Sequence, residues 1–439
     1  MNWAVAEQSG WHKTTIAMAG AVVAAVLIKL FLLYVVIPYL YQASPSTYTA
    51  AGSPDWYDLI AMNLVEGNGY RFSPDTAETM VRTPGYVLVL AGIFSVFGHS
   101  LAAAKAFNLL FSFATAYVVY VLGKRVTMSH RLALIAATVT FLHPAFLIAD
   151  SRGGLESLFT LTLMVFMLLT YRAIKTDAIK DYVFAGIALG VCLLIKSTPA
   201  LFPAVLFLYL VALRPNLARV RTAIIRVGAL SLVAGVVLSP WIIRNYALSG
   251  NFVPTMSVGG MAAYGGLHDV LHPGRENYLQ SEDVAAEMDA MLKEMKIPYK
   301  PGYYPQFYNI ADEVNFYRHL GDVAKKRYLE EPSLLLRVMA TNAIGFWING
   351  RTTKATVLNM IIVLPLLALA IWGACVGWRQ SLPVGPIVLF IVAFYLAHLP
   401  ILGQARYHVP LIPLLAILAC IPLRSVIGDV PTISSKRHG

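Results

Sequence analysis

Long apolar runs, separated by short polar breaks, follow one another through most of this chain. A helix needs about 20 apolar residues to cross a bilayer, with a range of about 17–25. Ten runs reach or approach that length, and two short ones on either side of Lys196 could form one broken hairpin instead of two crossings. The pattern therefore predicts an all-α polytopic membrane protein with about ten transmembrane helices. The predicted spans are residues 15–41, 102–123, 131–149, 155–172, 182–195, 199–213, 223–241, 356–378, 384–402 and 406–424.

The composition agrees with this pattern. Hydrophobic side chains make up 58% of the 439 residues and charged ones only 13%, whereas soluble domains have about 45–50% and about 25%. This balance excludes a disordered chain and a small disulfide-stapled secreted domain. Cys192, Cys375 and Cys420 all fall inside apolar runs, so we expect them in the core or facing lipid rather than in a disulfide framework or a metal cluster.

Basic residues concentrate in the breaks that lie on the same side of the membrane as both termini, if the number of spans is even. Lys and Arg are enriched in short cytoplasmic loops. When the termini, 124–131, 172–181, 214–226 and the turn at Arg379 are assigned to the cytoplasm, their excess of basic over acidic residues equals the net charge of the whole chain, +11. The topology thus explains the charge without a nucleic-acid-binding surface, and it predicts cytoplasmic termini.

Two longer segments, residues 42–101 and 242–355, then lie outside the cytoplasm. Their position divides the chain into an N-terminal transmembrane module over 1–241, with 42–101 as its first external loop, an external segment over 242–355, and C-terminal transmembrane helices with a short tail over 356–439. We expect the external segments to cover the outer ends of the spans.

Short helices are predicted inside these external segments. Tyr86–Phe97 is apolar but too short to cross, so we expect it to lie at the membrane surface or to re-enter. A helix capped at Ser281 should run to Lys296, a second should cover 311–330, and 334–349 either crosses the membrane or lies along its outer surface. The apolar face of the helix that begins after Ser281 indicates contact with the membrane surface. That face comprises Val284, Met288, Met291, Leu292 and Met295.

Ionisable residues gather at the predicted outer ends of the spans, where a charge is costly and by default indicates function. The cations among them run against the positive-inside bias, and an anionic ligand such as a phosphate would explain their presence. The alternative is that they are snorkelling anchors or structural ion pairs. The residues are Asp55, Asp58, Arg82, Asp150, Arg152, Glu156, Lys196, Arg244, Arg406 and His408.

Asp55, between Pro54 and Trp56, is the candidate for chemistry, because a partly desolvated carboxylate can act as a general base. An ordinary helix N-cap explains the same residue, and the spacing alone slightly favours that interpretation. Asp58, one turn later, could orient Asp55, bind a hydroxyl, or have no role at all. The sequence contains no Walker loop, GxGxxG, HExxH or Gly-x-Ser-x-Gly motif. The ten histidines show no ligand spacing, so a divalent metal ion is possible but unsupported, and no cofactor is expected.

Six short blocks follow one another in register between about residues 15 and 425. Each is weakly specific alone, and the six in order are more so. Together they resemble GT-C glycosyltransferases, in particular the group of the dolichyl-phosphate-mannose–protein mannosyltransferases and the bacterial lipid A aminoarabinose transferase. The blocks are Pro54–Leu64, Arg82–Tyr86, Leu155–Phe159, Leu194–Thr198, Pro240–Tyr246 and Arg406–Pro413.

The resemblance implies a GT-C helical bundle that moves a sugar from a polyprenyl-phosphate carrier to an acceptor on the extracytoplasmic side, with inversion and without a required metal. It implies that Asp55 is the base and that basic residues hold the carrier phosphate. The substrate-binding positions that it suggests are Asp58, Arg82, Glu156, Lys196, Arg244, Arg406, Tyr407 and His408.

The chain also departs from the pattern. Trp56 stands where eukaryotic protein mannosyltransferases have a glutamate, and no soluble domain follows the last predicted span, which puts a protein acceptor in doubt. The acceptor could equally be a lipid or a glycan. Because no Asn-x-Ser/Thr sequon occurs, we expect a bacterial inner-membrane enzyme with a periplasmic site and no nucleic-acid partner.

Two other functions remain open at this stage. A transporter or lipid flippase would use the same cations along a translocation path, and a non-catalytic membrane subunit would need none of them. Transporters often show internal repeats and ionisable groups at mid-depth, whereas here the charges lie at span ends. Tyrosines of 242–355 either contact sugar and acceptor or form an interfacial belt. They are Tyr264, Tyr299, Tyr303, Tyr304 and Tyr308.

Overall fold

The computed structural model describes most of the chain. Several predicted features lie outside the described residues, among them Asp55, Tyr303, the ends of the span predicted over 15–41 and the C-terminal tail. The described residues are 20, 22–36, 56–212, 217–272, 282–302, 304–350 and 353–427.

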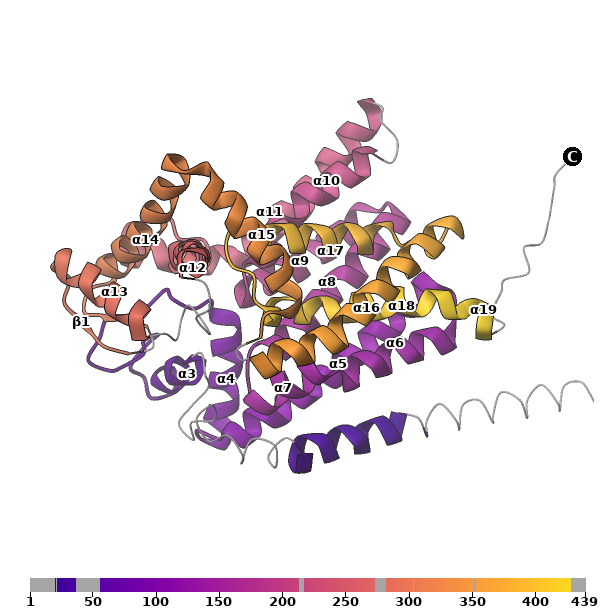
Figure 1. Cartoon of the computed structure of the whole chain (residues 1–439), viewed down its shortest axis with the longest axis horizontal. Helices are drawn as coiled ribbons and strands as arrows, with labels where there is room; N and C mark the ends of the chain where they lie inside the picture. The colour runs from indigo at the N-terminus through magenta and orange to yellow at the C-terminus, as the bar shows by residue number, and fades with distance from the viewer. Residues whose placement is uncertain are drawn as a thin grey trace, which may run out of the picture.

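Long apolar helices form a bundle (Figure 1). Five described stretches are long and apolar enough to cross a membrane, and a sixth is added if two helices that meet at 47° are counted as one span. The prediction of an all-α polytopic membrane protein is therefore confirmed. The five are α5 (Leu101–Thr127), α8 (Glu156–Thr176), α11 (Leu217–Ser249), α16 (Thr353–Arg379) and Ala405–Val426, which contains α18 (Ile412–Cys420); the bent pair is α6 (His130–Leu142) with α7 (Pro144–Arg152).

Shorter helices complete the bundle. α9 (Ile179–Ile195), α10 (Phe202–Ala212) and α17 (Gly385–His398) coincide with three of the predicted spans. Single 3-10 turns interrupt the chain where prolines remove a backbone donor, at Thr198–Leu201 and Val409–Leu411. The short helix α19 (Arg424–Ile427) ends the described part.

Glycines allow close contact between α9 and α11. A Cβ at Gly186 would lie 2.5 Å from the carbonyl oxygen of Leu230, and one at Gly190 would lie 2.6 Å from the Cβ of Val237. Small residues let helix backbones approach within a membrane, where dispersion contacts replace the hydrophobic effect as the source of association. The small residues of α9 therefore determine where it docks.

A buried ion pair attaches the N-terminal helix to the bundle. Lys29, in the apolar helix Val22–Val36, lies 2.6 Å from the carboxylate of Asp150 on α7 and donates to the carbonyl oxygen of Phe141 at 3.0 Å. Asp150 also accepts hydrogen bonds from Ser112 and Ser157. Because a buried charge is tolerated only when it is paired, Asp150 has a structural role here.

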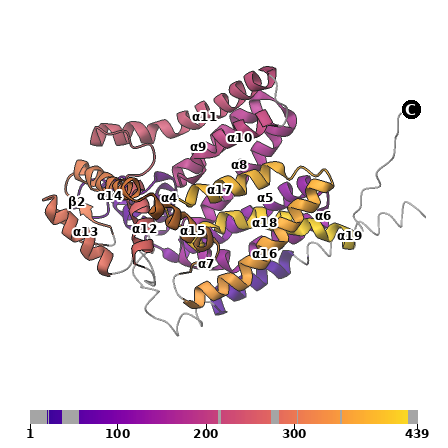
Figure 2. The ribbon, with the colours of Figure 1, turned by 45° about the horizontal axis from the view of Figure 1, so that its top comes forward.

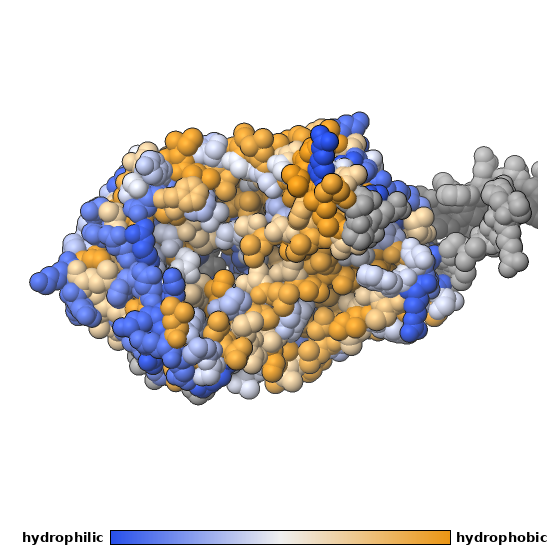
Figure 3. Space-filling view, turned by 90° about the horizontal axis from the view of Figure 1, so that it is seen from above, coloured by the Kyte–Doolittle hydropathy of each residue, from blue (hydrophilic) through white to orange (hydrophobic). Residues whose placement is uncertain are grey.

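The two segments predicted to be external form a layer, called the external layer below, at one end of the bundle, on the left in Figure 1. Figure 3 shows hydrophilic residues gathered at this same end, while apolar residues cover most of the bundle. The elements are α3 (Tyr57–Val65), α4 (Pro84–Phe97), α12 (Gly259–Leu271), α13 (Glu282–Glu294), α14 (Ile310–Glu330), α15 (Pro332–Ile348) and a two-stranded antiparallel sheet of β1 (Tyr299–Lys300) and β2 (Gln306–Phe307).

Helices α13 and α14 form close to the predicted positions, but the environment predicted for α13 is wrong. Val284, Met288 and Leu292 are buried within the main hydrophobic core instead of facing a membrane surface. An apolar stripe of helical period shows that one face is covered, but its period is the same whether protein or lipid covers it.

Candidate functional site

A cavity of ≈ 410 Å³ lies where the bundle meets the external layer. Among the described residues that line it, Arg82, Lys196 and Arg406 carry positive charge and Glu156 carries the negative charge. These residues are far apart in the sequence, and the fold brings them to one chamber, as the argument from span ends predicts. The remaining lining includes Tyr57, Thr198, Leu201, Met261, Tyr304, His398, Ile401, Leu402 and Tyr407.

Two tyrosine rings hold Arg82. Its guanidinium carbon lies 4.6 Å from the ring centre of Tyr57 on α3 and 4.7 Å from that of Tyr304. Arg82 also donates a hydrogen bond to the Tyr304 hydroxyl at 3.0 Å. A planar, weakly hydrated guanidinium stacks on aromatic faces better than an ammonium does. Residues from both external segments thus orient this cation in the cavity.

The ring of Tyr407 contacts the other two cations. The ammonium of Lys196 lies 4.8 Å from its centre, and the guanidinium carbon of Arg406 lies 5.3 Å from it. Lys196 follows the last residue of α9 in extended conformation, and Arg406 lies in the 3-10 turn Ala405–Tyr407. The predicted residues Lys196, Arg406 and Tyr407 therefore form one cationic cluster.

A direct contact couples the segments that carry Arg82 and Lys196. The hydroxyl of Thr83 donates to the carbonyl oxygen of Ile195 at 2.6 Å. A Cβ at Gly85, in the first turn of α4, would lie 2.8 Å from the carbonyl oxygen of Leu194. Only glycine allows α4 to approach the end of α9 this closely, which sets the separation of the two cations.

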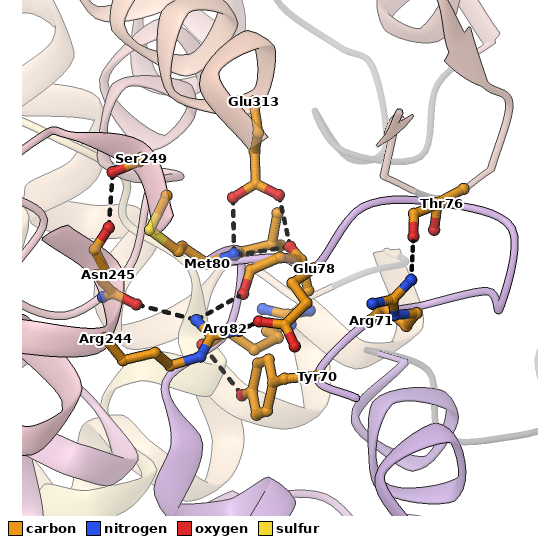
Figure 4. A network of polar contacts seen from close by, with 12 residues as sticks. Tyr70, Arg71, Thr76, Glu78, Met80, Arg82, Arg244, Asn245, Ser249 and Glu313 are labelled. Atoms are coloured by element: carbon orange, nitrogen blue, oxygen red, sulfur yellow. Dashed lines mark hydrogen bonds and ion pairs between the residues drawn. The ribbon is translucent and has the colours of Figure 1, made fainter. Parts of the chain in front are cut away.

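A buried carboxylate holds the chain just before Arg82 (Figure 4). Glu313 on α14 accepts hydrogen bonds from the Thr79 hydroxyl at 2.6 Å, the Met80 amide at 2.8 Å and the Ser257 hydroxyl at 2.7 Å. Burial raises the pKa of Glu313, and these hydrogen bonds oppose the rise. Glu313, a residue that the sequence did not single out, is therefore a positioning group for the loop of Arg82.

The structure does not bring Arg244 into the cavity with the other predicted cations. Its guanidinium forms an ion pair with Glu78 at 2.8 Å and donates to the carbonyl oxygen of Thr79 at 3.3 Å (Figure 4). The rings of Tyr70 and Trp241 lie against it. Arg244 therefore belongs to the network that holds the loop of Arg82, because its side chain leaves α11 toward Glu78.

Tyr70 belongs to the same network. Its hydroxyl lies 3.2 Å from the carbonyl oxygen of Arg82 and 3.1 Å from that of Thr83. Burial is the largest cause that raises the pKa of Tyr70 well above its usual value, so the phenol stays protonated and can donate to these carbonyls.

Two further predicted residues are not among the described residues that line the cavity. Asp58 is buried and lies 3.6 Å from the imidazole of His99. His408 is buried with its Nδ1 atom 3.1 Å from the carbonyl oxygen of Phe346. In their place the cavity presents Tyr57, Tyr304 and His398. Of the five tyrosines considered in 242–355, Tyr304 reaches it, whereas Tyr264 and Tyr299 bond to carboxylates of α13 and Tyr308 is exposed.

The statement that the histidines lack ligand spacing is wrong. His268 lies in the last turn of α12 and His272 is the C-cap residue that follows the helix, and Glu287 of α13 reaches them, so that one ligand atom of each lies within 4.8 Å of the others. The spacing of the two histidines could have been found in the sequence; the contribution of α13 could not.

A search against family models gives one match that bears on this cavity. Residues 81–243 match the model of the dolichyl-phosphate-mannose-protein mannosyltransferase family. The matched segment contains Arg82, Glu156 and Lys196. The resemblance predicted from the sequence blocks is thereby confirmed over this segment.

Solved structures similar to this chain include two of ArnT from Cupriavidus metallidurans. The one bound to undecaprenyl phosphate is 13% identical, with a TM-score of 0.42, and the match covers 95% of this chain and 81% of that one. The apo form is 14% identical, with a TM-score of 0.41, and the match covers 93% and 79%. No curated protein is significantly similar to this chain in sequence.

Proposed function

We propose that this protein transfers a sugar from a polyprenyl-phosphate carrier to an acceptor on the extracytoplasmic face of the membrane, by an inverting single displacement. The observation that carries the proposal is the cavity at the end of the bundle, in which Arg82, Lys196 and Arg406 meet. The family match over residues 81–243 supports the reaction class.

The three cations suit a phosphate leaving group. Negative charge grows on the carrier phosphate as its bond to the anomeric carbon breaks, and fixed cations in a water-poor cavity stabilise that charge more than they stabilise the ground state. Arg82 and Arg406 offer two donors in one plane, whereas Lys196 offers a compact charge. Glu156, in the first turn of α8, is positioned to accept hydrogen bonds from hydroxyl groups of sugar or acceptor.

Apolar side chains in the lining of the cavity suit the prenyl chain. Leu201, Ile401, Leu402 and Met261 line it, and Leu201 and Ile401 also have exposed side chains at the surface of the bundle. A carrier could therefore place its phosphate among the cations while its hydrocarbon leaves between helices into the lipid.

Asp55 is the proposed base. Its place in the sequence supports this role, because Tyr57, two residues further along the chain, lines the cavity. In the proposed step, the carboxylate takes the proton of the acceptor hydroxyl, the acceptor oxygen bonds to the anomeric carbon, and the bond to the phosphate breaks to release polyprenyl phosphate.

Turnover by the purified protein in lipid nanodiscs tests this assignment. A radiolabelled polyprenyl-phosphate sugar is added with candidate acceptors, and product formation and carrier release are both measured. An Asp55→Asn variant should lose about 100-fold or more in kcat, as expected for a general base, and should bind the donor with unchanged affinity.

Asp75→Asn is the matched control, because Asp75 is an exposed aspartate of the same external segment, paired with Lys300. Its kcat should equal that of the wild type. Turnover by Asp55→Asn at the wild-type rate would remove Asp55 from the mechanism. If the wild type forms no glycosylated product in nanodiscs but moves the donor across the bilayer of sealed proteoliposomes, the flippase alternative is favoured instead.

A further inference from the structure

A second cluster of functional side chains lies in the external layer, away from the described lining of the cavity. It comprises His268 of α12, His272 at the C-cap of this helix, and Glu287 of α13. His268 is buried, and the other two are half-buried. We propose that these three side chains bind a divalent transition-metal ion, with Zn²⁺ as the expected ion.

The ligand set suits this class of ion. Two imidazoles and one carboxylate are ligands that Zn²⁺ accepts, and two histidines four residues apart on a helix present their rings on one face. The ring centres of His268 and His272 lie 4.3 Å apart. A pure oxygen site, as Ca²⁺ or Mg²⁺ prefers, would not contain two imidazoles.

The spacing suits a tetrahedral ion. Ligand atoms about 2.0–2.2 Å from a tetrahedral Zn²⁺ lie about 3.3–3.6 Å from one another. The Nε2 atom of His268 lies 3.6 Å from a carboxylate oxygen of Glu287, and the full set of ligand atoms falls within 4.8 Å. Small rotations of His272 and Glu287 would therefore complete the coordination, with water as the fourth ligand.

Neighbouring groups already orient the ligands. The Nδ1 atom of His272 lies 3.3 Å from the carbonyl oxygen of His268, so an N–H at this position can donate to it and leave Nε2 for a metal. The hydroxyl of Tyr264 donates to the second oxygen of Glu287 at 3.0 Å. Hydrogen bonds of this kind, from a ligating imidazole to a carbonyl and from a partner to a ligating carboxylate, are typical of metal sites.

The position of the proposed metal site indicates which part of the structure the ion would stabilise. α12 lines the cavity with Gly259, Met261 and Ala262 at its start, and His268 and the C-cap residue His272 lie at its other end. An ion shared with Glu287 would tie α12 to α13. The metal would therefore stabilise the roof of the cavity and would take no part in the sugar transfer itself.

Metal binding by the full chain, purified in detergent without a polyhistidine tag, tests the proposal. The protein is stripped with a chelator and titrated with Zn²⁺ by calorimetry, and bound zinc is counted by mass spectrometry after dialysis. We expect one zinc per chain and a rise in Tm with Zn²⁺. Glu287→Gln and His268→Ala should each weaken Zn²⁺ binding by more than about 100-fold, and Tyr264→Phe by about 10-fold, the range found for outer-sphere partners.

Glu294→Gln and His319→Ala are the matched controls. Glu294 is an exposed glutamate on the same helix as Glu287, two turns further along, and His319 lies on α14; both variants should bind zinc as the wild type does. Equal zinc binding by Glu287→Gln and the wild type would overturn the proposal, as would wild-type protein that binds no zinc, in which case the cluster is a His268–Glu287 ion pair only. Because zinc is measured directly, neither result depends on whether the protein transfers sugar.

Discussion

Aromatic rings contact all three cations of the cavity. Arg82 lies between Tyr57 and Tyr304, and Tyr407 contacts both Lys196 and Arg406. A ring attracts a cation without forming an ion pair with it. A phosphate that enters the cavity therefore meets cations that aromatic contacts help to orient.

Substitution of Arg82 by lysine tests the role of the rings. Arg82→Lys keeps the positive charge but removes the planar stack, and a cation–π interaction contributes about 0.5–1 kcal/mol or more. Because Arg82 stacks on the rings of both Tyr57 and Tyr304, we expect donor affinity to fall about 10-fold, as measured by binding of the polyprenyl phosphate. The control is Arg337→Lys, at an exposed position of α15, which should leave affinity unchanged. Equal affinity in Arg82→Lys would show that the stack does not hold the phosphate-binding geometry.

At the level of elements, the contact between α4 and α9 sets the distance between two of the cations. Thr83 and Gly85 begin α4, and they meet the carbonyl oxygens of Ile195 and Leu194 at the end of α9. Arg82 precedes one of these helices and Lys196 follows the other. A change in the contact between α4 and α9 should therefore change the separation of Arg82 and Lys196 in the cavity.

A single methyl group at this contact should be costly. In Gly85→Ala the new Cβ would lie 2.8 Å from the carbonyl oxygen of Leu194 and 2.7 Å from a side-chain carbon of Ile195, so the helices must separate. We expect a loss of about 1–3 kcal/mol in the free energy of unfolding, together with weaker donor binding. Thermal unfolding and donor titration measure the two effects.

Gly92→Ala is the control on the same helix. Nothing lies within 4 Å of a Cβ at Gly92, and alanine is favoured over glycine inside a helix by about 0.5–1 kcal/mol. This variant should therefore be as stable as the wild type or slightly more stable. Identical behaviour of the two variants would contradict the steric argument for Gly85.

The whole molecule has two ends with different surfaces. The external layer covers one end of the bundle. Figure 3 shows hydrophilic residues gathered at that end. The cavity lies beneath this layer, between α12 and the ends of α9 and α17. The excess of basic residues in the segments at the opposite end predicts that the cavity faces away from the cytoplasm.

Cysteine labelling tests this orientation. In a Cys375→Ser background, which removes the exposed native cysteine, a membrane-impermeant maleimide should label a Glu294→Cys variant in intact spheroplasts of a bacterial host. A Lys180→Cys variant should be labelled only after the membrane is permeabilised. Both positions are exposed, on α13 and at the start of α9 respectively. The reverse pattern would place the cavity on the cytoplasmic side.

The sequence determined the membrane-protein class, most helix positions and three of the cavity cations. Span length follows from bilayer thickness, and successive spans reverse direction, so Arg82, Lys196 and Arg406 could be assigned to one side of the membrane from their order alone. The side of the membrane on which a residue lies follows from the number of spans that precede it in the chain. The sequence alone therefore predicts it.

Lateral position and side-chain direction are different, because they depend on which helices touch. Arg244 lies at a span end like the others, yet it turns to Glu78, 166 residues earlier in the chain. Only the tertiary structure showed that α13 buries its apolar face against protein, that Glu313 holds the loop of Arg82, and that Glu287 meets His268 and His272. Each of these contacts joins two segments that are brought together by packing between helices. The sequence pattern within one segment does not predict which other segment it will contact.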